Sequence, residues 1–206
     1  MKYLLIIIVT IGLFGCANVQ KKDLSAFTNA APRSILVVPV VNKTLDVDAP
    51  LYLSTTLPIP IANKGYYVFP VNTTKFILEQ EGLYEGERIH LIPTPQLAGM
   101  FGADAVLYVT INRWDAQYIV LSTTITVDFD YRIVSSTGVE IWRENKKMVY
   151  QPQNSGGGIL GAIITAAIAR AAPNYMPLAQ AANQQVFQIG PNQLPNGPYA
   201  TPDPVK

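Results

Sequence analysis

Residues 118–135, YIVLSTTITVDFDYRIVS, alternate between apolar and polar side chains over most of their length. In a strand, one face would carry the apolar side chains Val127, Phe129, Tyr131 and Ile133. The other face would carry the polar side chains Thr126, Asp128, Asp130 and Arg132. This period of two predicts a half-exposed antiparallel strand. The SSTG sequence at 135–138 predicts a turn, and 139–150 a returning strand with Val139, Ile141 and Arg143 on one side, so the pair forms a hairpin.

Two near-continuous apolar runs precede this hairpin, SILVVPVVN at 34–42 and GADAVLYVTIN at 102–112. Such runs predict strands that are buried on both faces, in a sheet covered by helices. Pro39 has no N–H group, so we expect it at an edge or an irregularity of the first strand. A shorter strand is predicted at 66–71.

Helical segments are predicted between and after these strands. Residues 46–64 are predicted to be helical at first, and Pro58 and Pro60 should then break or kink this helix. Further helices are predicted from about 72 to 80, at 95–101 and at about 176–187, with an extended connection at 90–95. The order of elements predicts an α/β (α+β) fold: one domain, 34–187, with a mixed β-sheet, a long antiparallel hairpin and helices packed on it.

The first residues predict export and lipid attachment. Lys2 precedes a mostly apolar stretch, 3–14, that is shorter than the roughly 20 residues needed to span a bilayer and is typical of a signal peptide. The LFGC sequence at 13–16 resembles a lipobox, despite the bulk of Phe14. That resemblance implies cleavage after Gly15 and lipidation of Cys16. We expect a signal peptide at 1–15 and a lipidated tether at 16–33.

Cys16 has a simpler interpretation, as an ordinary small residue in a signal-anchor helix. The position of this sole cysteine at the end of the apolar stretch favours lipidation, and its use for lipid excludes disulfides. Ala17 follows where an aspartate often retains lipoproteins in the inner membrane, so we expect the outer membrane, with the domain facing the periplasm.

Charge and reactive residues argue against several classes of function. The chain has 15 basic and 14 acidic side chains, without the basic excess of a nucleic-acid binder. The sole histidine, His90, has no nucleophile motif nearby, so we expect a loop histidine with a local hydrogen bond. We expect solvated glutamates at 79, 81, 85 and 87 and a cross-strand salt-bridge ladder at Asp128, Asp130 and Arg132. The sequence therefore predicts no enzyme, no metal and no cofactor.

Residues 159–172 predict a helix of small and apolar side chains. Small residues at helical spacing let two backbones approach closely, and the candidate interaction residues are Gly157, Gly158, Gly161, Ala162, Thr165, Ala166 and Ala169. Three interpretations stay open: a helix packed on its own sheet, a contact between subunits, or a segment that dips into the bilayer. The proline-rich residues 188–206 predict a disordered tail.

Four stretches in this order resemble a family of bacterial lipoproteins of unknown function: 35–42, 53–71, 101–109 and 138–142. The family is similar at the level of fold to the curli-secretion lipoprotein CsgG and to the amino-terminal domain of the periplasmic protein TolB. The resemblance covers most of 33–187 and implies no catalytic residues. It implies a shared envelope machine with a CsgG-like lipoprotein.

The hypothesis favoured by these observations is an outer-membrane-anchored, non-enzymatic component of an envelope transport, secretion or assembly complex. Its partners would be the membrane, other envelope lipoproteins and further copies of the chain, and no nucleic acid. The alternative is a periplasmic lipoprotein that regulates a cell-wall synthesis enzyme.

Overall fold

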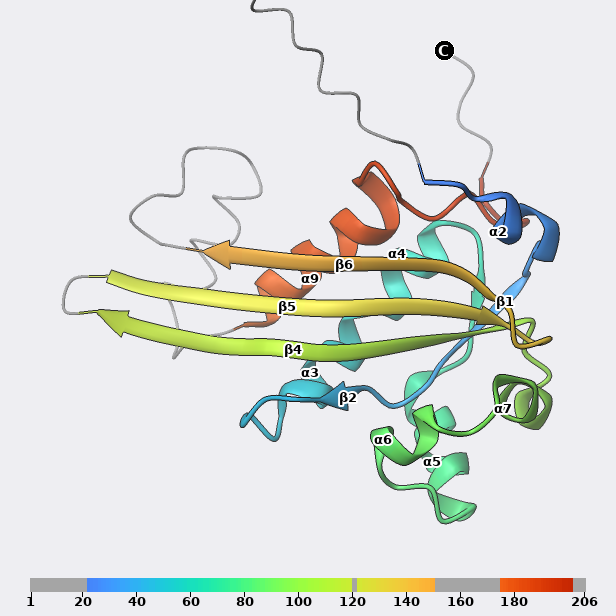
Figure 1. Cartoon of the computed structure of the whole chain (residues 1–206), viewed down its shortest axis with the longest axis horizontal. Coiled ribbons are helices and arrows are strands. Elements are labelled where there is room, and N and C mark those ends of the chain that lie inside the picture. The colour runs from blue at the N-terminus through green and yellow to red at the C-terminus, as the bar shows by residue number, and fades with distance from the viewer. Residues whose placement is uncertain (1–21, 120–121, 151–174, 202–206) are drawn as a thin grey trace, which may run out of the picture.

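The computed structural model describes residues 22–119, 122–150 and 175–201. Its centre is one mixed sheet in the order β3-β1-β4-β5-β6, with β2 paired to β4 (Figure 1). The strands are β1 Ser34–Val37, β2 Val41–Asn42, β3 Tyr67–Val68, β4 Ala105–Ile119, β5 Ser122–Ser135 and β6 Glu140–Tyr150. β1 is parallel to β3 and β4, and β2 is parallel to β4, whereas β4, β5 and β6 are antiparallel. The mixed sheet with its long hairpin is confirmed.

Helices cover both faces of the sheet around β1. On one face lie α3 Ala49–Thr56, α4 Pro58–Asn63 and α9 Met176–Gln184, which continues as the π-helix η2 Gln185–Ile189. On the other lie α5 Val71–Gln80, α6 Gly86–His90 and α7 Thr94–Phe101 (Figure 1). Alternate residues of β1 enter different cores: Ile35 packs with the first set of helices and Leu36 with the second. Within the described residues, no helix has the length and apolar character needed to cross a membrane.

The hairpin differs from the prediction in extent. β5 alternates as expected, and the side chains of Val127, Phe129, Tyr131 and Ile133 are fully buried. However, residues 118–119 belong to β4, which was expected to end at Asn112 and instead pairs with β5 as far as Ile119. Polar residues beyond Asn112 continue the strand because a sheet with one face in solvent accepts them there.

The face predicted for β6 is wrong because of a β-bulge. Glu140 pairs with Val134 and Trp142 pairs with Ile133, which leaves Ile141 as an extra residue between them. Ile141 and Trp142 are consequently both buried, and Val139 is exposed. Ile141 and Trp142 both pack in the core with the buried face of β5, whereas Val139 and Arg143 are exposed.

Of three shorter segments, two follow the prediction and one differs from it. The apolar run 34–42 is interrupted between β1 and β2, at the irregularity expected around Pro39. The helix expected across 46–64 is divided into α3 and α4, with Pro58 as the first residue of α4. An extended connection was expected to begin at His90. His90 is instead the last residue of the short helix α6.

The expected tether and disordered tail both need correction. Residues 25–30 form α2 Ser25–Ala30, which buries Phe27 in the core, so the tether is shorter than 16–33. After η2, the chain packs on the domain up to residue 201: Leu194 is fully buried, and Trp142 Nε1 donates a hydrogen bond to Asn192 O at 3.0 Å. Prolines favour extended conformations, and such a segment is ordered where its side chains and carbonyls find partners.

Candidate binding groove

The site begins at the break between β1 and β2. Pairing with β4 shifts from Val37 opposite Leu107 to Val41 opposite Thr110, so the chain holds one extra residue around Pro39. This break bends the strand and makes the floor of an open groove of about 410 Å³. Four buried valines form that floor: Val37, Val38, Val40 and Val41.

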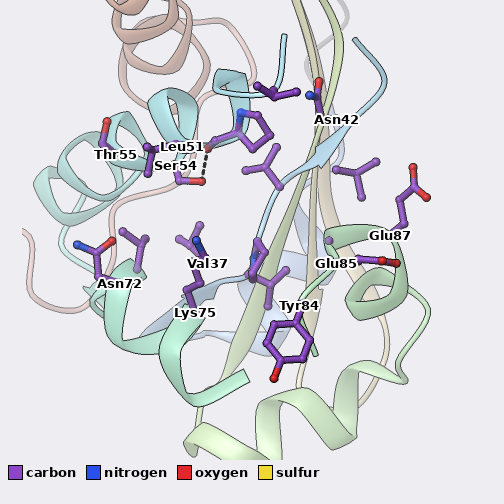
Figure 2. A pocket seen from close by; sticks show the side chains of 18 residues that line it. Val37, Asn42, Leu51, Ser54, Thr55, Asn72, Lys75, Tyr84, Glu85 and Glu87 are labelled. Carbon is purple, nitrogen blue, oxygen red and sulfur yellow. Dashed lines mark hydrogen bonds between the residues drawn. The ribbon is translucent and has the colours of Figure 1, made fainter. Parts of the chain in front are cut away.

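Three helical regions form the walls of the groove. Leu51, Ser54 and Thr55 come from α3, and Asn72 and Lys75 from α5. The loop before α6 and its first residues contribute Tyr84, Glu85, Gly86 and Glu87. Figure 2 shows Lys75 on one side of the groove and Glu85 with Glu87 on the other. Lys75 also forms an ion pair with Glu79, at 3.7 Å between Nζ and Oε1.

The rim of the groove is apolar and faces solvent. The exposed fractions are 86% for Val47, 56% for Leu51 and 69% for Tyr84. Large apolar side chains gathered around a hollow with a valine floor are typical of an interaction site.

β2 is an edge strand within this groove, since β4 is its sole partner strand in the described chain. Lys43 N donates to Ile111 O at 2.9 Å, which directs the backbone groups of residue 43 toward β4. Backbone groups of neighbouring residues in a strand point to opposite sides, so those of Asn42 point away from β4. An edge of this kind can pair with an extended peptide.

Two residues fix the floor from α6. A Cβ on Gly86 would lie 2.6 Å from the carbonyl oxygen of Val40, so a glycine is needed for this close approach. His90 Nε2 lies 3.0 Å from Pro39 O, and its ring packs edge-on against Tyr108 at 5.0 Å between centroids. Because a carbonyl oxygen only accepts, Nε2 carries the hydrogen. His90 thus ends a helix and holds Pro39, a partner far away in sequence, rather than making the local bond expected in a loop.

The protonation of His90 predicts a pH dependence of stability. The pKa of His90 is lowered from 6.5 to about 4, mainly by burial and also by the charge of Arg132, although the bond to Pro39 O acts to raise it. Between pH 6.5 and about pH 4, His90 binds a proton in the unfolded chain but not in the folded chain. We therefore expect the free energy of unfolding to fall by about 2–3 kcal/mol as the pH drops through this window.

Denaturant unfolding from pH 7 to pH 4 measures this effect, with His90→Gln as the matched control. A glutamine amide can still donate to Pro39 O but does not titrate. The part of the pH dependence of the free energy of unfolding that comes from His90 should therefore disappear in His90→Gln. An equal pH dependence in both proteins would contradict the lowered pKa of His90.

Asp128, Asp130 and Arg132 do not form the cross-strand salt-bridge ladder predicted from the sequence. Asn145 Nδ2 donates to Asp128 Oδ1 at 3.0 Å and to Asp130 Oδ1 at 2.9 Å. Arg132 instead lies over the Tyr108 ring, 4.7 Å from its centroid. The predicted salt-bridge ladder is therefore an amide–carboxylate cluster, because the guanidinium group turns to the aromatic ring.

Two of the four glutamates, Glu85 and Glu87, belong to the groove wall. In the described part of the chain, no three His, Cys, Asp or Glu side chains gather as a metal site requires. Cys16 and the candidate interaction residues 157–169 lie outside the described residues.

Sequence reasoning did not identify the groove itself. Its residues come from four separate stretches, which only the packing of α3, α5 and α6 around the strand break brings together. The proline inside the valine run was the one visible signal. Chemically, the site offers an apolar floor, an open strand edge and opposite charges on two walls, which suits an extended peptide.

Comparison with known proteins identifies the family of this chain. The family model described as "Putative lipoprotein GNA1162-like" matches residues 22–199. "Putative lipoprotein NMB1124/NMB1162" of Neisseria meningitidis serogroup B is 33% identical over 172 residues, which cover 82% of this chain and 80% of that protein.

The solved structure of a family member agrees with this assignment. The crystal structure of lipoprotein GNA1162 from Neisseria meningitidis is 32% identical, with a TM-score of 0.59, over 68% of this chain and 97% of that chain. The PelC dodecamer from Paraburkholderia phytofirmans is 14% identical, with a TM-score of 0.48, over 78% of this chain and 88% of that one. The relation to CsgG and TolB stays a prediction.

Proposed function

Since the chain belongs to the GNA1162-like lipoprotein family, we propose that it is a lipid-anchored, non-enzymatic component of an outer-membrane assembly or transport complex. Its task would be to hold an extended segment of a partner envelope protein in the groove between α3, α5 and β2. One observation carries the proposal: the open edge of β2 lies at the floor of a groove whose rim exposes Val47, Leu51 and Tyr84.

The chemistry of the groove defines the kind of partner. Apolar side chains of the peptide would pack on the valine floor, while its backbone pairs with β2. The carboxylates of Glu85 and Glu87 favour a basic residue of the peptide at one end. Such binding needs no reactive group, and His90 Nε2 is engaged with Pro39 O.

Loss of partner binding is expected for Leu51→Asp. A carboxylate at this rim position would lose its hydration when the apolar side chains of the peptide cover it, which should weaken binding by at least about tenfold. Val139→Asp is the control, since Val139 is equally exposed but lies outside the groove.

The measurement is photo-crosslinking in intact cells from an amino acid placed at Tyr84, compared with the same group at Val139. We expect one defined envelope protein crosslinked from Tyr84, and loss of that product in Leu51→Asp. Equal crosslinking from both positions would contradict the groove as the binding site. Identification of the product as a cell-wall synthesis enzyme would establish the alternative, a regulatory lipoprotein.

Removal of the lipidated thiol tests the anchor. We expect Cys16→Ser to incorporate no labelled palmitate, because the hydroxyl group of serine does not replace the thiol that receives the diacylglyceryl group. Phe14→Ala is the control and should stay lipidated, since a small residue suits the lipobox better. The attached chains should anchor the wild-type protein stably. Label on Cys16→Ser equal to wild type would refute lipidation at this residue.

A further inference from the structure

The folded domain begins very close to the proposed lipid attachment point. Lys22 Nζ lies 4.0 Å from Glu144 Oε2 of β6, and Phe27 in α2 is only 3% exposed. Five residues, 17–21, lie between Cys16 and Lys22, so six residue-to-residue steps join them. At about 3.3–3.6 Å per residue, the chain between them can span at most about 20 Å. If Cys16 carries lipid, as the proposed function requires, the domain must lie against the bilayer.

The surface next to Lys22 is built from both ends of the described chain. Phe27 packs edge-on against Tyr66, at 6.1 Å between ring centroids, and the Tyr66 hydroxyl donates to Pro195 O at 2.8 Å. Tyr199 N donates to Gly65 O at 3.0 Å. Trp142, two residues from Glu144, donates to Asn192 O. Figure 1 shows the blue segment that leads into α2, the red helical turn that follows α9 and the red C-terminal segment along one edge of the molecule.

This edge exposes side chains suited to a lipid headgroup region. Ile189 at the end of η2 is 60% exposed, and Tyr199 is 65% exposed. Tyrosine is enriched at membrane–water interfaces because its ring is apolar and its hydroxyl is polar. Lys22 lies at the point where the chain leaves the domain, and because Glu144 lies beside it, its charge adds only a weak attraction to anionic lipids.

We propose that the domain contacts the bilayer through this anchor face, defined by Lys22, Ile189 and Tyr199. α5 and α6, which form two walls of the groove, lie at the opposite edge of the molecule (Figure 1). In this orientation the groove opens away from the lipid, toward the aqueous side of the envelope. The short tether keeps the domain at the surface, so a partner must come to the membrane to reach the groove.

Single-cysteine probes test this orientation directly, because Cys16 is the only natural cysteine and its thiol is blocked by lipid in the proposed mature protein. The full-length lipoprotein would carry Tyr199→Cys or Ile189→Cys, labelled with a polarity-sensitive fluorophore. The matched controls are Tyr84→Cys in the groove wall and Leu91→Cys directly after α6, and both of these residues are exposed. Each protein is reconstituted into vesicles of phosphatidylethanolamine and phosphatidylglycerol that contain headgroup-spin-labelled lipid.

We expect quenching at positions 189 and 199 to be at least threefold stronger than at 84 and 91, with a blue-shifted emission. Equal quenching at all four positions, or stronger quenching at 84, would overturn the anchor face even if the protein floats with the vesicles. The mass of the intact protein distinguishes this result from failure of the proposed function. If Cys16 carries no acyl chains, the lipid-anchored function is refuted, and the anchor face with it.

Discussion

The substitution Asn183→Leu is expected to lower the free energy of unfolding by about 2–4 kcal/mol. Asn183 is fully buried in α9 and joins three elements. The Tyr131 hydroxyl donates to Asn183 Oδ1, at 2.6 Å, and Asn183 Nδ2 donates to Thr56 Oγ1, at 2.7 Å. Leucine would leave two buried polar groups without this partner, and burial already raises the pKa of Tyr131 well above its ordinary value.

Denaturant unfolding measures this loss, and Gln184→Leu is the matched control because the neighbouring Gln184 is exposed. The control should change the free energy of unfolding by less than about 0.5 kcal/mol. Adding Tyr131→Phe to Asn183→Leu should restore part of the stability, because one unsatisfied hydroxyl is removed. Equal stability of Asn183→Leu and Gln184→Leu would show that the network contributes nothing.

The second large effect is expected for Leu194→Ala, at about 2–4 kcal/mol of lost stability. Leu194 is fully buried against the core, although it lies in the proline-rich stretch that the sequence assigned to a disordered tail. The substitution removes buried methyl groups and leaves a cavity that the extended segment around it can fill only in part.

Thermal and denaturant unfolding again give the measurement, with Asn196→Ala as the control. Asn196 is two residues away and exposed, so its replacement should leave the transition almost unchanged. If Leu194→Ala unfolds like wild type, residues 190–201 are not part of the folded domain.

The parts of the fold that follow from the pattern of apolar and polar side chains along the sequence could be predicted. The alternation around Phe129 identified β5 and its buried face, because a strand with one face in solvent must alternate. The buried strand at 102–112 and the position of Pro39 at an irregularity were also visible in the sequence. Each of these features depends on local pattern, and the structure places each in the sheet.

Features that depend on tertiary partners could not be predicted. The bulge at Ile141 shows only through the pairing of Trp142 with Ile133. The order of the C-terminal segment depends on Trp142 and Tyr66, which each donate a hydrogen bond to a backbone carbonyl of that segment. The groove depends on how α3, α5 and α6 pack around the break at Pro39, and no spacing in the sequence encodes that arrangement.

The most direct test of a lipid-anchored protein that binds its partner through the groove is the mass of the native, detergent-extracted complex. The wild-type protein and Leu51→Asp would be extracted in parallel and measured by native mass spectrometry. We predict a defined assembly that contains a second envelope protein for wild type, and its loss for Leu51→Asp with the acylated chain intact. A bare acylated monomer from wild-type membranes would contradict the account.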